Sequence, residues 1–145
     1  MLVTERTFVV NRPTEAVLSY LQDFAHAEEW DPGTVTCTQR TPGPVAVGTV
    51  WDNVTSVLGR KTQIDYRLTV LEPHRVVFVG KNKASQSTDD IRIMPRDGGS
   101  STITYRSEIV FHGPWVVFQY LLKPVFNRLG DETRDKITAA VHRLS

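Results

Sequence analysis

The segment that most constrains the fold is the last third of the chain, where a strand-like stretch leads directly into a long helix. Apolar and polar residues alternate over 101–111, and His112-Gly113-Pro114 then ends this strand. The helix that follows, of up to about thirty residues, begins almost wholly apolar. Its apolar residues are Trp115, Val116, Val117, Phe118, Tyr120, Leu121, Leu122, Val125, Phe126 and Leu129. Such a helix needs cover on more than one side, from a membrane, a partner or a surrounding sheet.

The composition is that of an ordinary soluble globular chain, and it excludes several kinds of site. With 145 residues, of which 40% are hydrophobic and 23% charged, we expect one domain over residues 1–145. The net charge of +1 and the lack of a dense Lys/Arg run give no reason to expect a nucleic-acid partner. The single cysteine, Cys37, excludes an intramolecular disulfide and a multi-cysteine zinc site.

The sequence motifs predict no cofactor, no metal ion and no integral membrane segment. The four histidines lack metal-ligand spacing, and no phosphate-cradling or dinucleotide-binding glycine motif is present. The first residues do not form a signal peptide, and the apolar cluster at 115–122 is too short to cross a bilayer. We therefore predict a cytoplasmic protein, and leave open whether it is a monomer or a homodimer.

Hydrophobic periodicity and turn residues predict the order of elements. The first strand is expected at 2–10, followed by a helix that Asn11 caps and Pro13 helps to start, and by a short helical turn at 26–30. Further strands are expected at 34–41, 49–58, 61–71, 75–81, 89–94 and 101–111, with a tight hairpin at 96–100. The long helix comes last. Pro124 and Gly130 should bend it, either as a static curve or as a gate.

These elements predict an α+β fold, in which one long helix must cover a whole sheet. Short connections favour antiparallel neighbours, so we expect a curved antiparallel sheet of about seven strands wrapped around the C-terminal helix. The two short helices follow the first strand. One helix cannot fill the concave face of such a sheet, and a cavity between sheet and helix is therefore expected.

Four stretches, taken in their order and spacing, resemble a known family. They are residues 11–17 (NRPTEAV), residues 23–33 with Trp30-Asp31-Pro32-Gly33 at their end, residues 47–51 (VGTVW), and Gly113-Pro114. The chain resembles the START-like and birch-pollen-allergen-like helix-grip superfamily (SRPBCC), especially its bacterial polyketide cyclase/dehydrase-like branch. The resemblance implies a deep, mostly apolar cavity for lipids, polyketides, hormones or other hydrophobic molecules. It does not choose between carriers, sensors and cyclases.

Eight residues are candidates for lining this cavity and binding a ligand. They are Trp30, Trp51, Asn53, Tyr66, Tyr105, Phe118, Leu122 and Phe126. The resemblance places Trp51 and Asn53 inside, because the family's cyclases direct an aromatic and polar residues of this strand into the cavity. Trp30 could instead plug the junction of helix and sheet, and each tyrosine could hydrogen-bond another side chain rather than a ligand.

Three functions remain open at this point. The leading hypothesis is binding of a hydrophobic small molecule, either a lipid or an aromatic, polyketide-like compound. The second is a polyketide aromatase/cyclase or dehydratase acting in the same cavity, for which the sequence identifies no catalytic residue. The third is a protein-interaction module without a ligand, which predicts a filled interior and an exposed apolar patch over residues 115–122.

Overall fold

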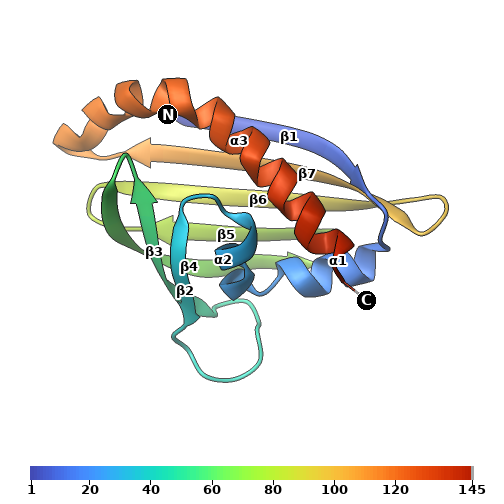
Figure 1. Ribbon diagram of the computed structural model, residues 1–145. Coiled ribbons are helices and arrows are strands. Elements are labelled where there is room, and N and C mark those ends of the chain that lie inside the picture. The colour runs from blue at the N-terminus through green and yellow to red at the C-terminus, as the bar shows by residue number, and fades with distance from the viewer. Residues whose placement is uncertain (145) are drawn as a thin grey trace.

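The computed structural model describes residues 1–144 and contains a seven-stranded antiparallel sheet crossed by one long helix (Figure 1). The predicted α+β helix-grip fold is confirmed. The elements in chain order are β1 (Leu2–Val10), α1 (Thr14–Leu21), η1 (Phe24–His26), α2 (Ala27–Trp30), β2 (Thr34–Gln39), β3 (Val50–Val57), β4 (Arg60–Glu72), β5 (Arg75–Lys81), β6 (Ser85–Arg96), β7 (Ser100–Phe111), η2 (Gly113–Val117) and α3 (Phe118–His142). Along the sheet the strands run in the order β1-β7-β6-β5-β4-β3-β2.

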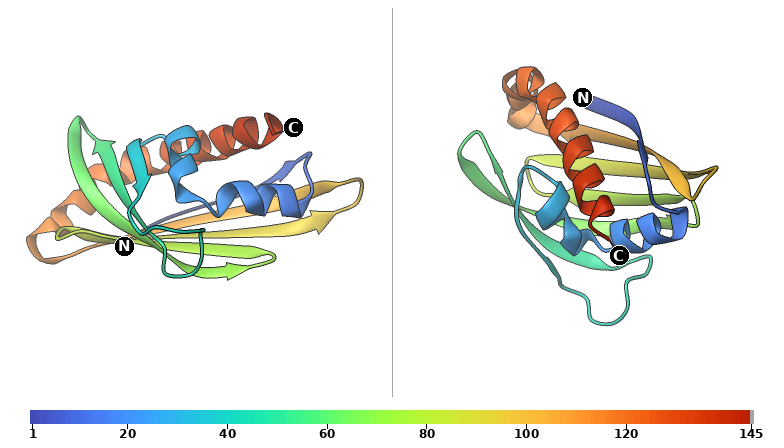
Figure 2. Two further views of the ribbon diagram at one scale, coloured as in Figure 1. Left: turned by 90° about the horizontal axis from the view of Figure 1, so that it is seen from below. Right: turned by 45° about the vertical axis from the view of Figure 1, so that its right-hand side comes forward.

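The sheet curves around its inner face, and α3 runs along that face beside β1, with α1 and α2 on the same side (Figure 2). Gly130 allows α3 to approach β1 closely, because a Cβ atom at this position would lie 2.5 Å from Oγ1 of Thr4. Arg6 of β1 ties the two elements together. Its guanidinium donates to Asp131 at 2.8 Å and to the carbonyl oxygen of Asn127 at 3.0 Å.

The interior is filled at one end of the sheet only. Around η1 and α2, a buried cluster is built on Phe24, Trp30, Trp51 and Phe78, whose rings meet at centroid distances between 4.5 and 6.1 Å. At the other end the buried cluster contains only Leu2, Leu122 and Phe126. The structure therefore has a packed half and a half in which few side chains fill the space between sheet and helix.

Two of our expectations about helix beginnings are wrong. The first helix begins at Thr14 after Pro13, without a side-chain cap; Asn11 instead uses its backbone N–H to donate to His142. The terminal helix begins only at Phe118, after the η2 turn, and its first residues are not surrounded by the sheet. This segment lies at the end of the strands, beyond the concave face that could cover it (Figure 1).

The expected bend in the terminal helix is present. The α3 helix continues through Pro124 without a break in its assignment, and its first turns run in a different direction from the rest (Figure 1). Proline removes one backbone donor and bends a helix in this way. Whether the segment before Pro124 also moves as a gate stays a prediction.

Candidate ligand cavity

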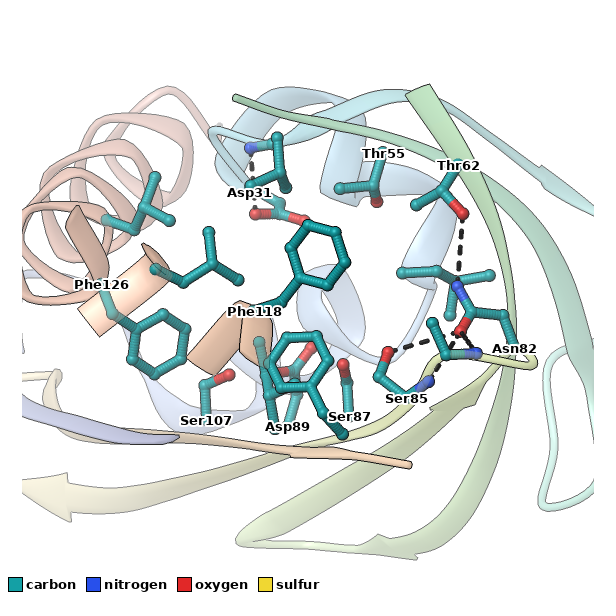
Figure 3. Close-up of a pocket in the computed structure, with 18 of the residues that line it drawn as sticks. Asp31, Thr55, Thr62, Asn82, Ser85, Ser87, Asp89, Ser107, Phe118 and Phe126 are labelled. Carbon is teal, nitrogen blue, oxygen red and sulfur yellow. Dashed lines mark hydrogen bonds between the residues drawn. The ribbon is translucent and has the colours of Figure 1, made fainter. Parts of the chain in front are cut away.

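A cavity of about 470 Å³ lies between the open half of the sheet and the first half of α3 (Figure 3). Its walls come from the inner faces of β3, β4, β6 and β7 and from η2 and α3. The residues that line it are Thr4, Asp31, Gly33, Thr55, Val57, Leu58, Arg60, Lys61, Thr62, Gln63, Ile64, Tyr66, Asn82, Lys83, Ala84, Ser85, Ser87, Asp89, Tyr105, Ser107, Ile109, Phe111, Trp115, Phe118, Leu122, Phe126, Leu129, Gly130 and Thr133.

Strand alternation explains how the sheet divides between core and cavity. In β6, every second residue faces inward: Ser85, Ser87 and Asp89 line the cavity, and Ile91 and Ile93 continue into the packed core. In β7, Tyr105, Ser107 and Ile109 do the same on the neighbouring strand. The inner face thus changes from apolar to polar at Asp89 and Tyr105, where the packed half meets the hollow one.

The Tyr66 ring lies flat against β5, which a side chain on that strand would prevent. A Cβ atom at Gly80 would lie only 2.6 Å from Cε1 of Tyr66. Burial raises the pKa of both Tyr66 and Tyr105 well above the usual value of a phenol, and the nearby Asp89 carboxyl adds to the shift. Both phenols are therefore neutral and can donate hydrogen bonds at physiological pH.

Asp89 is the central polar group at the closed end. Its side chain is 5% exposed, and its Oδ1 accepts a hydrogen bond from the Tyr105 hydroxyl at 3.1 Å. Burial raises the pKa of Asp89 to about 7, and repulsion from Asp31 acts in the same direction. Hydrogen bonds from Ser107 and Tyr105 oppose this rise. Near neutral pH this carboxyl is therefore divided between its protonated and charged forms.

Asp31 provides a second carboxyl, held in place from behind by a chain of hydrogen bonds. The Thr34 hydroxyl donates to Asp31 at 2.6 Å, and the Asn53 amide donates to the Thr34 hydroxyl oxygen at 3.0 Å. Burial raises the pKa of Asp31, while Thr34, the backbone N–H of Gly33 and the Lys136 ammonium lower it in part. The remaining exposed surface of Asp31 belongs to the cavity lining.

The opposite end of the cavity is wide and aromatic. Trp115 stacks on Phe118 at a centroid distance of 5.6 Å, and Phe118 contacts Phe111 of β7 at 6.3 Å. Leu58 of the β3–β4 turn, Arg60 and Lys61 at the beginning of β4, and Lys83 of the β5–β6 turn complete this end. In Figure 3, Phe118 and Phe126 extend from the helix side into the cavity.

Five of the eight expected residues line the cavity, namely Tyr66, Tyr105, Phe118, Leu122 and Phe126. The other three, Trp30, Trp51 and Asn53, do not line it. They are fully buried in the packed half, where large aromatic rings fill the junction of helix and sheet. Trp51 and Asn53 do point inward as expected, but the Trp51 indole donates to Asp23 at 3.2 Å and the Asn53 amide supports Thr34. Trp30 packs edge-on against Phe24 and Tyr105.

The sequence analysis missed both carboxyl groups. Asp89 lies two residues before Ile91 on an alternating strand, so extending that alternation by one step would have placed it inside. Asp31 follows Trp30 and precedes Pro32-Gly33, and these neighbours indicated only the end of a helix. No pattern in the sequence shows that Asp31 and Asp89 line the same cavity, because this depends on how α2 packs on the sheet.

Among residues 1–144, no group of three or more His, Cys, Asp or Glu side chains is arranged to hold a metal ion. Within the same residues, no helix combines the length and apolar character needed to span a membrane.

The family model described as polyketide cyclase / dehydrase and lipid transport matches residues 1–141. The chain belongs to this family. No match is found among curated proteins. Among solved structures, the Zhui aromatase/cyclase from Streptomyces sp. R1128 is similar with a TM-score of 0.80 at 15% identity, over 98% of this chain and 94% of that one.

Two further solved structures share the fold. A START superfamily protein from Mycobacterium smegmatis has a TM-score of 0.80 at 13% identity, covering 99% of both chains. Ara h 8.0201 has a TM-score of 0.60 at 10% identity, covering 95% of this chain and 98% of that one. At identities this low, the similarity shows a shared fold. It does not show that this chain binds the same ligand or catalyses the same reaction.

Proposed function

We propose that the protein binds a hydrophobic small molecule, either a lipid or an aromatic, polyketide-like compound, in the cavity between the sheet and α3. The observation that carries this proposal is the unfilled volume of about 470 Å³. It falls within the roughly 300–1,000 Å³ that ligand sites usually enclose. The third function considered above, an interaction module with a filled interior, does not account for this space. The cytoplasmic location and the monomeric or dimeric state remain predictions.

The arrangement of the walls supports binding in one orientation. Phe118, Leu122 and Phe126 offer apolar surface near the open end, and burial of ligand surface there contributes about 25 cal/mol per Å², less the cost of immobilising the ligand. Asp89 and Tyr105 supply hydrogen-bonding groups at the closed end. A ligand therefore enters with its polar end first and leaves its apolar body against α3.

Titration with fatty alcohols, sterols and aromatic polyketides tests the proposal, with displacement of a fluorescent apolar probe as the readout. Ile109→Trp places an indole in the cavity and should weaken binding at least about tenfold, since the ligand loses the space it needs. Val110→Trp is the matched control, because Val110 is the next residue of β7 and is exposed on the outer face. A folded protein that binds none of these compounds would contradict the proposal.

A second candidate, a polyketide aromatase/cyclase, is favoured by the pair Asp31 and Asp89. With the pKa of Asp89 near 7, the protonated form of one carboxyl can coexist with the charged form of the other. The charged carboxylate would take a proton from the carbon between two ketones, and the protonated carboxyl would give one to the ketone oxygen that the new carbon–carbon bond leaves negative. Both groups would then hold the opposite protonation state, and solvent would restore them.

Turnover of a poly-β-ketone substrate distinguishes catalysis from binding alone. Asp31→Asn and Asp89→Asn should each lower kcat at least about a hundredfold if the pair transfers protons, while the substrate still binds. Asp90→Asn is the control, since Asp90 is on the outer face and pairs with Arg75 at 2.9 Å. Binding of the substrate with no product would leave only the first function.

A further inference from the structure

The closed end of the cavity carries two carboxyl groups and no positive counter-charge in contact with them. Neither Asp31 nor Asp89 takes part in any ion pair among residues 1–144. The basic side chains that line the cavity lie at its open end: Arg60 and Lys61 begin β4, and Lys83 is in the β5–β6 turn. A buried carboxylate without a charged partner costs free energy, which a bound cation would recover.

The Asp89 carboxylate also has free capacity to accept hydrogen bonds. Tyr105 donates to it at 3.1 Å and Ser107 is a second donor, while an ionised carboxylate offers about four acceptor sites. The small exposed part of its side chain faces the cavity, beside Ser87 and Ser107 (Figure 3). A donor-rich head group placed here would meet oxygen atoms on several sides.

We propose that the cavity selects a ligand whose apolar body ends in a protonated amine, seated against Asp89 and Asp31. This inference rests on the proposed binding function and narrows its ligand class. An ammonium group has three N–H donors and no acceptor, which matches a surface made of carboxylate and hydroxyl oxygens. A fatty acid is excluded in this orientation, because its carboxylate would lie against two acidic groups. The cations at the opening are solvent-exposed and screened, so they do not offset this preference.

The same geometry makes amine binding depend on pH. The other titratable groups around the pair are Lys136, Tyr66, Tyr105 and Cys37. Burial also raises the pKa of the Cys37 thiol to about 12, so neither it nor the tyrosines change charge near neutral pH. An ammonium pairs with the charged form of Asp89, whose pKa is about 7, so binding releases a proton. Amine affinity should rise about tenfold from pH 6 to pH 8, and the affinity of a neutral alcohol should not change.

Dodecylamine, dodecanol and dodecanoate have the same apolar chain and differ only in the head group. Differences in their affinity therefore measure what the head group contributes to binding. Calorimetric titration at pH 8 should find the amine at least tenfold tighter than the alcohol, with the carboxylate weakest. Asp89→Asn should remove the preference for the amine, so that the amine and the alcohol bind with similar affinity, whereas Asp90→Asn, on the outer face, should leave the preference as it is.

Two results would overturn the amine preference while leaving the binding function intact. One is an alcohol that binds as tightly as the amine, and the other is a preference for the amine that survives in Asp89→Asn. If none of the three compounds binds to the folded protein, the proposed function fails together with the preference.

A second inference comes from the surface around the cavity opening, where Leu58 and Trp115 also line the cavity. Six large apolar side chains there are between 39% and 69% exposed: Leu58, Trp115, Val116, Val117, Tyr120 and Leu121. They come from the β3–β4 turn and from η2 and the beginning of α3, which lie at the same end of the molecule (Figure 1). We call these six residues the apolar rim.

Positive charge is concentrated at the same end. Residues 57–63, 81–87 and 112–130 contain Arg60, Lys61, Lys81, Lys83, Lys123 and Arg128, and none of the 16 acidic residues of the chain. The net charge of the whole chain is only +1, so the rest of the molecule carries a net negative charge. An apolar surface interleaved with Lys and Arg matches the interface of an anionic membrane, where apolar side chains insert and cations meet head groups.

We infer that the apolar rim docks on an anionic lipid bilayer, with the cavity opening facing the membrane. A second copy of the chain is a poorer occupant, because twofold pairing of this face would bring like charges together. Sedimentation with vesicles should show binding to phosphatidylcholine mixed with phosphatidylglycerol and little binding to phosphatidylcholine alone. The bound fraction should fall with salt, and Trp115 fluorescence should shift to shorter wavelength.

Variants test whether the apolar rim and the nearby cations are responsible for vesicle binding. Lys61→Glu with Lys83→Glu, and separately Tyr120→Ser with Leu121→Ser, should each lower the bound fraction at least about fivefold. Arg92→Glu is the control, because Arg92 is exposed on the outer face of β6, away from the rim. Equal binding by the charge-reversed and unaltered proteins would overturn the inference. So would capture by an acidic protein without any vesicle binding.

Discussion

At the scale of single residues, the closed end of the cavity depends on a few side chains in tight surroundings. Gly80 gives the Tyr66 ring its position, and Asn53 and Thr34 fix the Asp31 carboxyl from behind. Tyr105 holds Asp89. Most of these contacts join residues that are distant in sequence, so small substitutions here should have measurable consequences.

Gly80→Ala should destabilise the protein by about 1–3 kcal/mol, because the added methyl group overlaps the Tyr66 ring. The ring must then tilt away from β5, and ligand affinity should fall as well. Urea unfolding and probe displacement measure the two effects. Val79→Ala, on the same strand, is the control and should lower ligand affinity less. If Gly80→Ala changed neither stability nor affinity, the Tyr66 ring would have room to move.

Asp89→Asn should change the pH dependence of stability. The folded-state pKa of about 7 lies above the ordinary value of 3.8, so the native state keeps a proton that the unfolded chain releases. Between these two values the free energy of unfolding therefore falls as pH rises, by up to roughly 4 kcal/mol from this group. The asparagine variant should gain stability relative to the unaltered protein from pH 5 to pH 8 in urea titrations. Asp90→Asn should show no such gain.

At the scale of elements, the position of α3 decides both the core and the cavity. Its second half is packed against β1 and α2, where Gly130 meets Thr4 and Arg6. Its first half contacts little besides its own end of the sheet and leaves the apolar rim exposed. The bend at Pro124 lies between the exposed first half of α3 and its packed second half.

Gly130→Ala should lower the free energy of unfolding by about 1–3 kcal/mol, since the new Cβ atom would meet the Thr4 hydroxyl oxygen. The closest contact of the new Cβ atom is with the Thr4 side chain, so adding Thr4→Ala to Gly130→Ala should restore part of the lost stability. Chemical unfolding of the single and double variants measures this coupling. Additive effects of the two substitutions would contradict it.

The sequence predicts elements better than it predicts which surfaces they cover. Alternation over 61–71 and 101–111 was enough to predict these strands, and short connections were enough to predict antiparallel neighbours. Gly98 and Gly99, both with positive φ, form the expected hairpin turn. The exposure of Trp115 to Leu121 was not predictable from their apolar character, because it depends on where the sheet ends. Asp31 and Asp89 escaped notice for a similar reason: their shared site is created by packing between distant segments.

At the scale of the whole molecule, one half is packed and the other encloses space. Local stability follows the density of buried apolar contacts. The aromatic cluster around Phe24 and Phe78 makes the packed half cooperative, while the segment from η2 to Pro124 has few buried side chains.

Amide hydrogen exchange should therefore be faster over residues 118–124 than over residues 133–141, although both belong to α3. A bound ligand should slow exchange in the first segment more than in the second, because its apolar body would contact Phe118 and Leu122. Mass spectrometry of the exchanged peptides measures both differences. Equal protection along the helix would show that the hollow half is as cooperative as the packed one.

The boundary between the two halves has a consequence for how such a protein can change over time. Tyr66, Tyr105 and Asp89 end the packed half and also form the floor of the cavity, so a substitution there alters folding and recognition together. Ile109, Phe118 and Leu122 border the opening, where fewer neighbours constrain them. Substitutions that change which ligand is bound are thus expected to accumulate in evolution near the entrance, while the floor stays unaltered.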